Sequence, residues 1–526
     1  MSTAGSTDSD GTIVATTLDF GDNVLVSATP ATHVYEAAGT YTITAIVTDD
    51  DGATATVSTN VTVTGTGVGP LTPSLVASRT SGFAPLAVHF DATGASSTTP
   101  GVSDLAQGGA FRQIRHAFNF GDPASGNHAL SGLNRNTEPF GGGLAAHVFR
   151  APGIYTVTVT STDGVAPAVI ATVMITVDDP ALLPAIAISR TGDFTGAPLG
   201  ATQLTRTTLP VLASNSRYFF RRGEDWGAAE LLVSDPLTNV HIDAFGPGDD
   251  PVFRRVGVGT ARPETGVFVS DVRVSHVTAR EGLAQETGSR ILFDACTSLA
   301  PMSGSGLAYA PIDPWRNVPQ EGFENAEEIY FVGCRLIGDG TPTGYMWFGN
   351  GSRLVFLDTA FGGTAQGTVR VTAWDRGVMR HCELASPWTD SSVHALKAHA
   401  GGPNLYTRNW VASGSVNTNT SNSVNWMTSR LVIANNVFGA GPGHAAWTVA
   451  VCPQNDAYGA NGWEPLADVI IENNTFVDSP STSLDVAWRG RRFTSRGNVM
   501  SPANSGLTTG GGHSQAVQYD GPYFSQ

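Results

Sequence analysis

Four basic residues, Arg370, His394, Lys397 and His399, could supply acid–base chemistry from two neighbouring extended segments, residues 368–374 and 392–399. A lysine or histidine base beside an arginine that neutralises a uronate carboxylate suits β-elimination from a polysaccharide. Solvated polar residues on the outer face of a fold give the same pattern. The sequence therefore offers these four residues as catalytic candidates of a polysaccharide lyase and leaves the plain surface interpretation open.

Aromatic residues near these segments could bind sugar rings. Trp374 and Trp488 would offer stacking platforms beside the basic residues. Trp447, Tyr458 and Trp463 fall in a long excursion between two similar segments, where they could bind carbohydrate or pack on a partner subunit. Covering the edge of the fold is the alternative role for all of them.

Paired carboxylates for glycoside hydrolysis, at a separation of about 5–10 Å, have weaker candidates. The Asp249–Asp250 pair lies in a loop rich in glycine and proline and is typical of a turn, and a surface ion pair with Arg496 would explain Glu472. The acidic run Asp49, Asp50 and Asp51 could ligate Ca²⁺, although an ordinary turn also explains it. We expect no other cofactor.

The element that must position these residues is a repeat. Residues 431–438 (LVIANNVF) and 469–476 (VIIENNTF) follow one pattern, which recurs at 329–336, 354–361, 377–384 and 493–500, and more weakly at 291–298 and 405–412. A short apolar strand that recurs in this way predicts the stacked coils of a solenoid. One position of each copy should form an internal ladder: Cys296, Cys334, Thr359, Cys382, Trp410, Asn436, Asn474 and Asn498.

The first 180 residues contain a second duplication. The segment Asp19-Phe-Gly-Asp22 matches Asn119-Phe-Gly-Asp122, and His33, Gly39 and Tyr41 match His147, Gly153 and Tyr155 at the same spacing. Each tyrosine opens an alternating strand that ends in an Asp-rich turn, as in a β-sandwich. The second copy carries a longer loop, residues 122–146.

Both copies resemble polycystic-kidney-disease (PKD) domains, Ig-like modules that act as spacers or in adhesion and carry no catalytic residues. The first copy lacks the edge strand that precedes residue 9 in this family, which would let a partner add a strand. The repeat resembles the right-handed parallel β-helix of pectate-lyase-like proteins and phage tailspikes. The sequence thus predicts an all-β chain with PKD-like domains at 1–66 and 72–178, a capping segment at 183–250 and a right-handed parallel β-helix at 251–526.

Charge and composition narrow the function. The net charge of −16 over 526 residues, with Lys397 as the only lysine, argues against nucleic-acid binding. No segment is apolar over the length that spans a bilayer, and the N-terminus does not resemble a secretory signal. The four cysteines, Cys296, Cys334, Cys382 and Cys452, show no metal spacing and fit buried thiols.

We therefore expect a structural or adhesive surface protein. The first hypothesis is a phage virion component of the decoration, fibre or tailspike type, on the virion surface or extracellular, that forms a homo-oligomer, contacts other surface proteins and binds carbohydrate on the β-helix. The alternative is a secreted polysaccharide lyase or glycoside hydrolase of β-helix fold.

Overall fold

The computed structural model divides the chain into two compact units, residues 1–70 with 98–100 and residues 71–97 with 101–526. The described residues run from 3 to 520. They leave out residues 4, 23–24, 28–29, 34, 36–38, 64–68, 100–112, 235, 260–267, 286–287, 300–325, 338–345, 349–350, 363–366, 386–393, 401–403, 408, 412–414, 420–430, 440–448, 455–466, 478–481, 487–490, 497–498, 501–506 and 510–516. Within these ranges, no helix has the length and apolar character needed to cross a membrane.

The first unit contains one described antiparallel sheet in the order β2-β1-β3-β4. Its core consists of Leu18, Phe20, Ile43 and Ala45, which alternate with outward polar residues along β1 and β3. Its strands are β1 (Ile13–Asp19), β2 (Leu25–Val26), β3 (Gly39–Asp49) and β4 (Thr54–Val63).

The second unit begins with a sandwich of two sheets, β11-β10-β13-β14-β7 and β12-β8-β6, around a core that includes Phe90, Phe118 and Phe149. We call this sandwich, residues 71–178, the second sandwich. Its elements are β5 (Leu71–Thr72), β6 (Val76–Ala77), β7 (Ser81–Phe83), β8 (Leu86–Asp91), β9 (Ser96–Ser97), β10 (Arg115–Asn119), the 3₁₀ turn η2 (Pro123–Ser125), β11 (Thr137–Gly141), β12 (Leu144–Phe149), β13 (Gly153–Thr162) and β14 (Val169–Asp178).

The duplicated motif makes the same contacts in both copies. The Asp19 and Asn119 side chains each accept a hydrogen bond from the amide two residues later. His33 bonds Asp22 at 2.6 Å and stacks on Phe20, while His147 bonds Asp122 at 3.0 Å and stacks on Phe120. The recurring residues therefore fix a turn and a ring stack.

The edge strand that the first copy was predicted to lack has a counterpart in the second sandwich. There β6 lies at the edge of the three-stranded sheet, next to β8, which is central and pairs with β12 on its other side. A second edge strand, β7, pairs with β14 in parallel. In the first unit, no described strand pairs with the outer edge of β4, the counterpart of β14.

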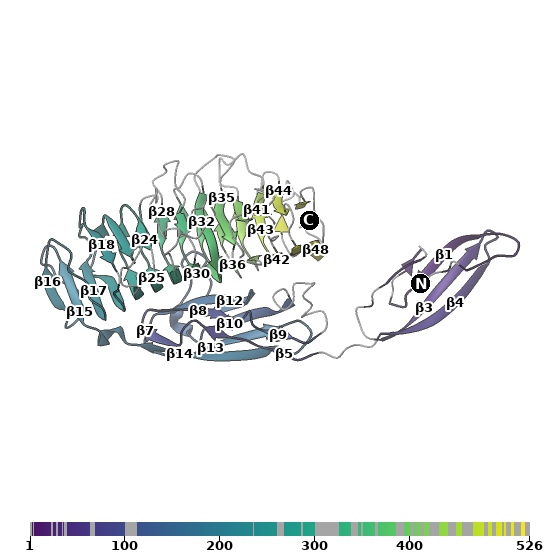
Figure 1. Ribbon diagram of the computed structural model, residues 1–526, viewed down its shortest axis with the longest axis horizontal. Helices are drawn as coiled ribbons and strands as arrows, with labels where there is room; N and C mark the ends of the chain where they lie inside the picture. Colours follow the sequence, from purple (N-terminus) through teal and green to yellow (C-terminus); the bar gives the residue numbers. More distant parts are fainter. Residues whose placement is uncertain are drawn as a thin grey trace. The chain divides into compact units, whose positions relative to one another are not determined.

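The rest of the second unit is a parallel β-helix whose coils stack along three ladders (Figure 1). The turn η3 (Pro180–Leu182) precedes it, and β15 already pairs with β17 in the longest ladder, so residues 183–250 contribute strands to the same sheet. The strands of this longest ladder are β15 (Ala185–Ser189), β16 (Thr202–Thr205), β17 (Ser216–Arg221), β19 (Val240–Phe245), β22 (Ser270–Ser275), β25 (Gly288–Asp294), β27 (Ala326–Val332), β30 (Gly351–Leu357), β33 (Gly377–Arg380), β36 (Asn404–Thr407), β39 (Leu431–Ala434), β42 (Ala467–Glu472), β45 (Arg491–Arg496) and β48 (Val517–Asp520).

The other two ladders complete each coil. The strands of the second are β20 (Val252–Phe253), β23 (Thr278–Ala279), β26 (Thr297–Ser298), β28 (Arg335–Ile337), β31 (Ala360–Gly362), β34 (Glu383–Ala385), β37 (Trp410–Val411), β40 (Val437–Gly439), β43 (Thr475–Val477) and β46 (Val499–Met500). We call the remaining strands the third ladder. They are a separate three-stranded sheet, β18 (Glu230–Val233), β21 (Arg255–Val258) and β24 (Leu283–Gln285), and a later run in which each strand pairs with the next: β29 (Met346–Phe348), β32 (Gly367–Asp375), β35 (His394–Ala400), β38 (Ser415–Asn419), β41 (Val449–Gln454), β44 (Thr482–Val486) and β47 (Leu507–Thr509).

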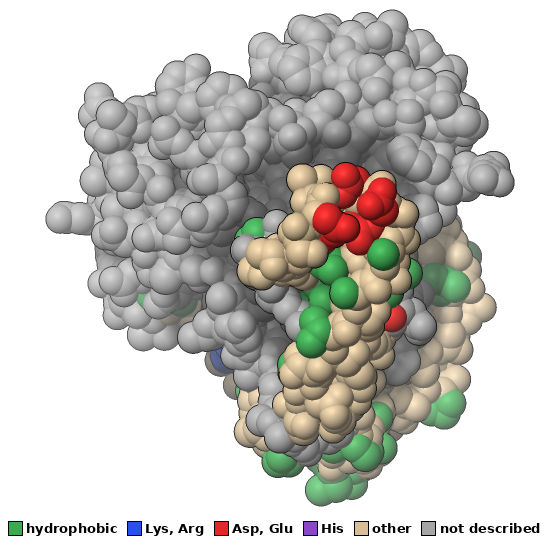
Figure 2. Space-filling view, turned by 90° about the vertical axis from the view of Figure 1, so that its right-hand side faces the viewer, with side chains coloured by type: hydrophobic (Ala, Val, Ile, Leu, Met, Phe, Trp, Pro, Cys, Tyr) green, Lys and Arg blue, Asp and Glu red, His purple; other side chains and the backbone are tan. Residues whose placement is uncertain are grey.

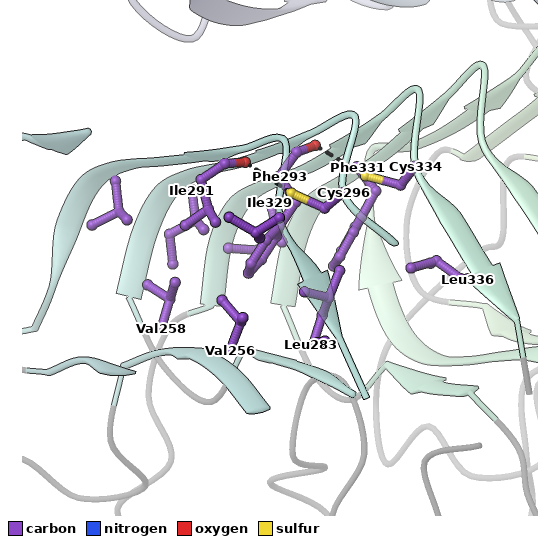
Figure 3. Packing of buried hydrophobic residues seen from close by; sticks show 14 of the residues in the cluster. Val256, Val258, Leu283, Ile291, Phe293, Cys296, Ile329, Phe331, Cys334 and Leu336 are labelled. Atoms are coloured by element: carbon purple, nitrogen blue, oxygen red, sulfur yellow. Dashed lines mark hydrogen bonds between the residues drawn. The ribbon is translucent and has the colours of Figure 1, made fainter. Parts of the chain in front are cut away.

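Equivalent side chains stack from coil to coil inside the β-helix. Ile291, Ile329 and Leu354 are in register, and the rings of Phe293 and Phe331 stack with centroids 5.0 Å apart. Cys296 and Cys334, three residues after these phenylalanines, are also buried in the interior as free thiols (Figure 3). The repeat in the sequence is therefore one coil, and the predicted all-β fold with a parallel β-helix is confirmed.

The polar end of each repeat forms a corner. The first corner residue has a left-handed backbone, with φ of 56° at Asp358, 55° at His381 and 56° at Asn435. Asparagine and aspartate adopt this conformation more readily than other residues with a Cβ. The next residue points inward, where the amide of Asn436 donates to Asn474 at 3.0 Å. The Asn-Asn doublets thus combine a corner residue with a ladder residue.

One predicted ladder position is wrong by one residue. The inward residue of its coil is Asn409, whose Oδ1 accepts from the Cys382 amide at 3.0 Å and whose own amide donates to Asn436 at 2.9 Å. Trp410 instead belongs to β37, in register with Val437. The copy begins at Asn404, because Leu405 pairs with Val432 rather than with Leu431. Asn498 lies outside the described residues.

Replacing Asn436 with alanine should destabilise the β-helix by about 2–4 kcal/mol, because two donors of Asn409 would lose their buried acceptor. The control is Asn435→Gly, which keeps the left-handed corner and should change stability by no more than about 0.5 kcal/mol. Urea denaturation of the two variants measures the difference. Equal stability of the two variants would contradict the role of the ladder.

Candidate functional site

The outer face of the longest ladder is apolar and buried against the second sandwich. Ala87, Ala146 and Val148 of that sandwich pack in one cluster with outward-facing residues of successive coils, and β12 and β8 lie along these coils (Figure 1). The coil residues of this cluster are Leu292, Tyr330, Val332, Val355, Leu357, Val378, Leu405, Val432, Ala434 and Ile470. The strands are therefore apolar on both faces, as in a sheet that is covered on both sides.

Ion pairs and hydrogen bonds surround this apolar contact. Arg150 holds both carboxylate oxygens of Asp294, at 2.5 and 2.8 Å, and Arg273 donates to the Pro85 carbonyl at 2.7 Å. These contacts supply a counterion to the buried Asp294 carboxylate and an acceptor to the buried Arg273 guanidinium, both of which would otherwise be costly to bury. We call the ion pairs that join the second sandwich to the coils the docking pairs: Arg79–Asp271, Asp91–Arg376, Arg115–Glu472, Arg135–Asp358, Glu138–Arg380 and Arg150–Asp294.

The long loop between β10 and β12 folds over the corner residue Asp358. The backbone amides of Ala129 and Leu130 donate to its two oxygens at 2.7 and 2.8 Å, and Arg135 adds a third bond at 2.9 Å. Only 1% of the Asp358 side chain is exposed. The carboxylate of this corner residue of the solenoid therefore binds the loop.

Beside Asp358, two histidines and a glutamate meet in what we call the buried His–Glu cluster: His128, Glu138 and His381. The two imidazole rings stack with centroids 3.7 Å apart, and His381 Nε2 lies 3.1 Å from Glu138 Oε1. His381 Nδ1 lies 2.8 Å from the Ser131 hydroxyl, and Glu138 Oε2 lies 3.1 Å from Arg380 Nη1. His128 Nδ1 has no hydrogen-bond partner and lies 3.8 Å from Asp358 Oδ2.

Burial governs the protonation of this region. Burial, helped by neighbouring His381, lowers the pKa of His128 to about 3, so the ring is neutral at physiological pH. Burial by itself would raise the pKa of Asp358, but the two loop amides and Arg135 outweigh it, and that pKa lies below its ordinary value. The loop thus meets an ionised carboxylate and an uncharged imidazole.

Among the described residues, the buried His–Glu cluster is the one group with three suitable ligand atoms close enough to share a metal ion, since they lie within 4.8 Å of one another. Two imidazoles and a carboxylate are the ligand types that suit Zn²⁺ and similar transition metals rather than Ca²⁺. The donors are chemically suited to such an ion.

The basic residues proposed as catalytic lie on adjacent strands of the third ladder. Arg370 on β32 pairs with Lys397 on β35, Thr372 pairs with His399, and Gly367 pairs with His394. Trp374 is in register with Ala400. The register brings Arg370, Lys397 and His399 into one neighbourhood of the backbone, and their catalytic role stays a prediction.

The aromatic candidates Trp447, Tyr458, Trp463 and Trp488 lie outside the described residues. Acidic side chains gather at one end of the first unit (Figure 2). There Asp49 accepts from the Ala53 amide within its turn, and Asp50 accepts from the Thr12 amide before β1, each at 2.7 Å. Asp51 is exposed, and Ca²⁺ binding by these aspartates stays a prediction.

Two of the acidic residues have partners in the structure. Glu472 is buried under the second sandwich rather than at the surface, where Arg115 donates to it at 3.1 Å, and Arg496 is its neighbour in the ladder register. Asp250 pairs with Arg222 across its turn.

The buried His–Glu cluster was not predicted from the sequence, although two signals were present. The long loop of the second copy supplies His128 and Glu138. In the repeat, Arg380 takes the outward position that Val332 and Leu357 fill in the preceding coils, so a charge stands in an apolar column. A buried charge in such a column requires a partner from elsewhere in the chain.

Comparison with known proteins supports the N-terminal assignment. Residues 1–64 match the PKD domain family. The similar solved structures share little sequence with this chain. Three of them are the catalytic domain of a GH87 alpha-1,3-glucanase in complex with tetrasaccharides (10% identity, 88% of this chain and 99% of that chain, TM-score 0.34), PfbA, a surface adhesin of Streptococcus pneumoniae (12%, 55% and 73%, TM-score 0.30), and a Yersinia enterocolitica family 28 exopolygalacturonase (10%, 84% and 97%, TM-score 0.27).

Proposed function

We propose that this chain is a structural or adhesive protein of a cell or virion surface, in which the second sandwich braces the β-helix. The observation that carries the proposal is the apolar outer face of the longest ladder, which the second sandwich covers and the docking pairs surround. Because the second sandwich covers this face, the face stabilises the β-helix and does not bind a ligand. The third ladder is then the face for a carbohydrate ligand.

The proposal predicts that the chain binds polysaccharides without cleaving them. The full chain should bind acidic polysaccharides on a glycan array, and the Arg370→Ala and Lys397→Ala variants should bind more weakly than Arg206→Ala, an arginine elsewhere in the chain. Binding of no glycan, together with failure to adhere to any cell surface, would contradict the proposal.

A polysaccharide lyase is the second candidate, favoured by the register that pairs Arg370 with Lys397. It predicts an unsaturated uronate product, detected by its ultraviolet absorbance, that Lys397→Ala abolishes and Arg206→Ala leaves unchanged. Release of this product would replace the adhesive function by an enzymatic one.

We also propose that partners add a strand at the outer edge of β4, where no described strand pairs, whereas its counterpart β14 pairs with β7. The mass of the full chain in solution tests for a homo-oligomer. A monomer that also binds no peptide with the sequence of residues 80–91 would contradict this proposal.

A further inference from the structure

We propose that the buried His–Glu cluster is a binding site for a divalent transition-metal ion of the zinc class, which would fasten the long loop of the second sandwich to the β-helix. The inference does not depend on the proposed function. Its three ligands come from three places in the fold: His128 from the loop, Glu138 from β11 and His381 from a coil corner.

One nitrogen or oxygen atom of each residue lies within 4.8 Å of the other two. The Ser131 hydroxyl can accept the Nδ1 proton of His381, which leaves Nε2 as the ligand atom. Arg380 Nη1 lies 3.1 Å from Glu138 Oε2, while Oε1 lies 3.1 Å from His381 Nε2. His128 Nδ1 has no hydrogen-bond partner although the side chain is only 7% exposed. Outer partners of this kind orient the ligands of known metal sites.

The ion would take the place of the proton of neutral His381 on Nε2, which now lies 3.1 Å from Glu138 Oε1, and that proton would move to Nδ1, which would then donate to the Ser131 hydroxyl. Two ligand atoms of a tetrahedral zinc ion lie about 3.4 Å apart, so atoms that now span up to 4.8 Å would move closer together. Because protons compete for the same lone pairs, affinity should fall in acid.

The carboxylates of Glu138 and Asp358 face the guanidinium groups of Arg380 and Arg135, so a divalent ion would add positive charge to this buried region. Arg380 lies on the carboxylate oxygen that the ion would not use. A water or hydroxide in the fourth position would complete the ligand set.

The experiment titrates the full chain, stripped with a chelator, with Zn²⁺ and with Co²⁺. We expect one ion per chain, a rise in melting temperature and a Co²⁺ absorption spectrum typical of nitrogen and oxygen ligands. His128→Gln and His381→Gln should weaken zinc binding more than about 100-fold, and Ser131→Ala, which removes only an outer partner, about 10-fold.

The matched control is His116→Gln, since His116 is also buried but bonds Ser161 away from the cluster. Zinc affinity should be unchanged in this variant. Absence of zinc binding by the stripped wild-type chain would overturn the inference, as would binding that survives both His128→Gln and His381→Gln. The cobalt spectrum of the wild-type chain keeps the test decisive if a variant does not fold.

Discussion

Replacing Asp358 with asparagine should lower the free energy of unfolding by about 3 kcal/mol, although the two side chains have nearly the same size. The substitution turns one of the two acceptors into a donor that faces the loop amides of Ala129 and Leu130, and it leaves Arg135 without its counterion. Asparagine tolerates the left-handed corner at φ 56°, so backbone strain does not contribute.

Urea denaturation of the full chain measures this loss, and amide hydrogen exchange should locate it, with faster exchange at Ala129 and Leu130. The control is Asp225→Asn, which breaks a pair with Arg280 in which both side chains are about half exposed. It should cost no more than about 1 kcal/mol. Equal losses in the two variants would show that the loop does not depend on Asp358.

Acidification should cost the fold several kcal/mol between pH 8 and pH 5, well above the range in which most carboxylates titrate. Burial lowers the pKa of His89 to about 3, of His116 to about 4, of His128 to about 3 and of His241 to about 2. The unfolded chain binds these protons near pH 6.5 and the folded chain does not, so stability falls as pH falls below 6.5. Each histidine contributes about 2 kcal/mol at pH 5.

Three of these histidines lie where the second sandwich meets the coils. His89 bonds the Arg376 carbonyl, His241 bonds the Arg273 guanidinium, and His128 stacks on His381. Acid should therefore loosen the docking of the second sandwich before the coils themselves unfold.

Melting temperatures at pH 8, 6.5 and 5, with hydrogen exchange at β8 and β12, measure this effect. His116→Gln should reduce the pH dependence by the share of one histidine, because glutamine takes up no proton. A stability that stays level from pH 8 to pH 5 would contradict the buried, neutral state of these side chains.

The ladder position at Trp410 and the burial of Glu472 escaped prediction for a common reason. The ladder position was misplaced at Trp410 because the weak copy was aligned from its first leucine, and only the pairing of Leu405 with Val432 reveals the shift. Glu472 was expected at the surface because its partner Arg115 lies 357 residues away in the sequence. Both depend on contacts that the spacing of a single repeat does not contain.

The coil of the β-helix can be predicted from the sequence alone. Its apolar strand, left-handed corner and inward ladder residue lie within eight residues, and each coil pairs only with its neighbours, so a local pattern suffices. The same octapeptides also show apolar residues at consecutive positions, such as Tyr330 and Phe331, a pattern of strands covered on both faces. What covers the outer face was decided only by the tertiary structure. The second sandwich, its docking pairs and the buried His–Glu cluster join residues more than 100 positions apart, and no periodicity in the sequence records such contacts.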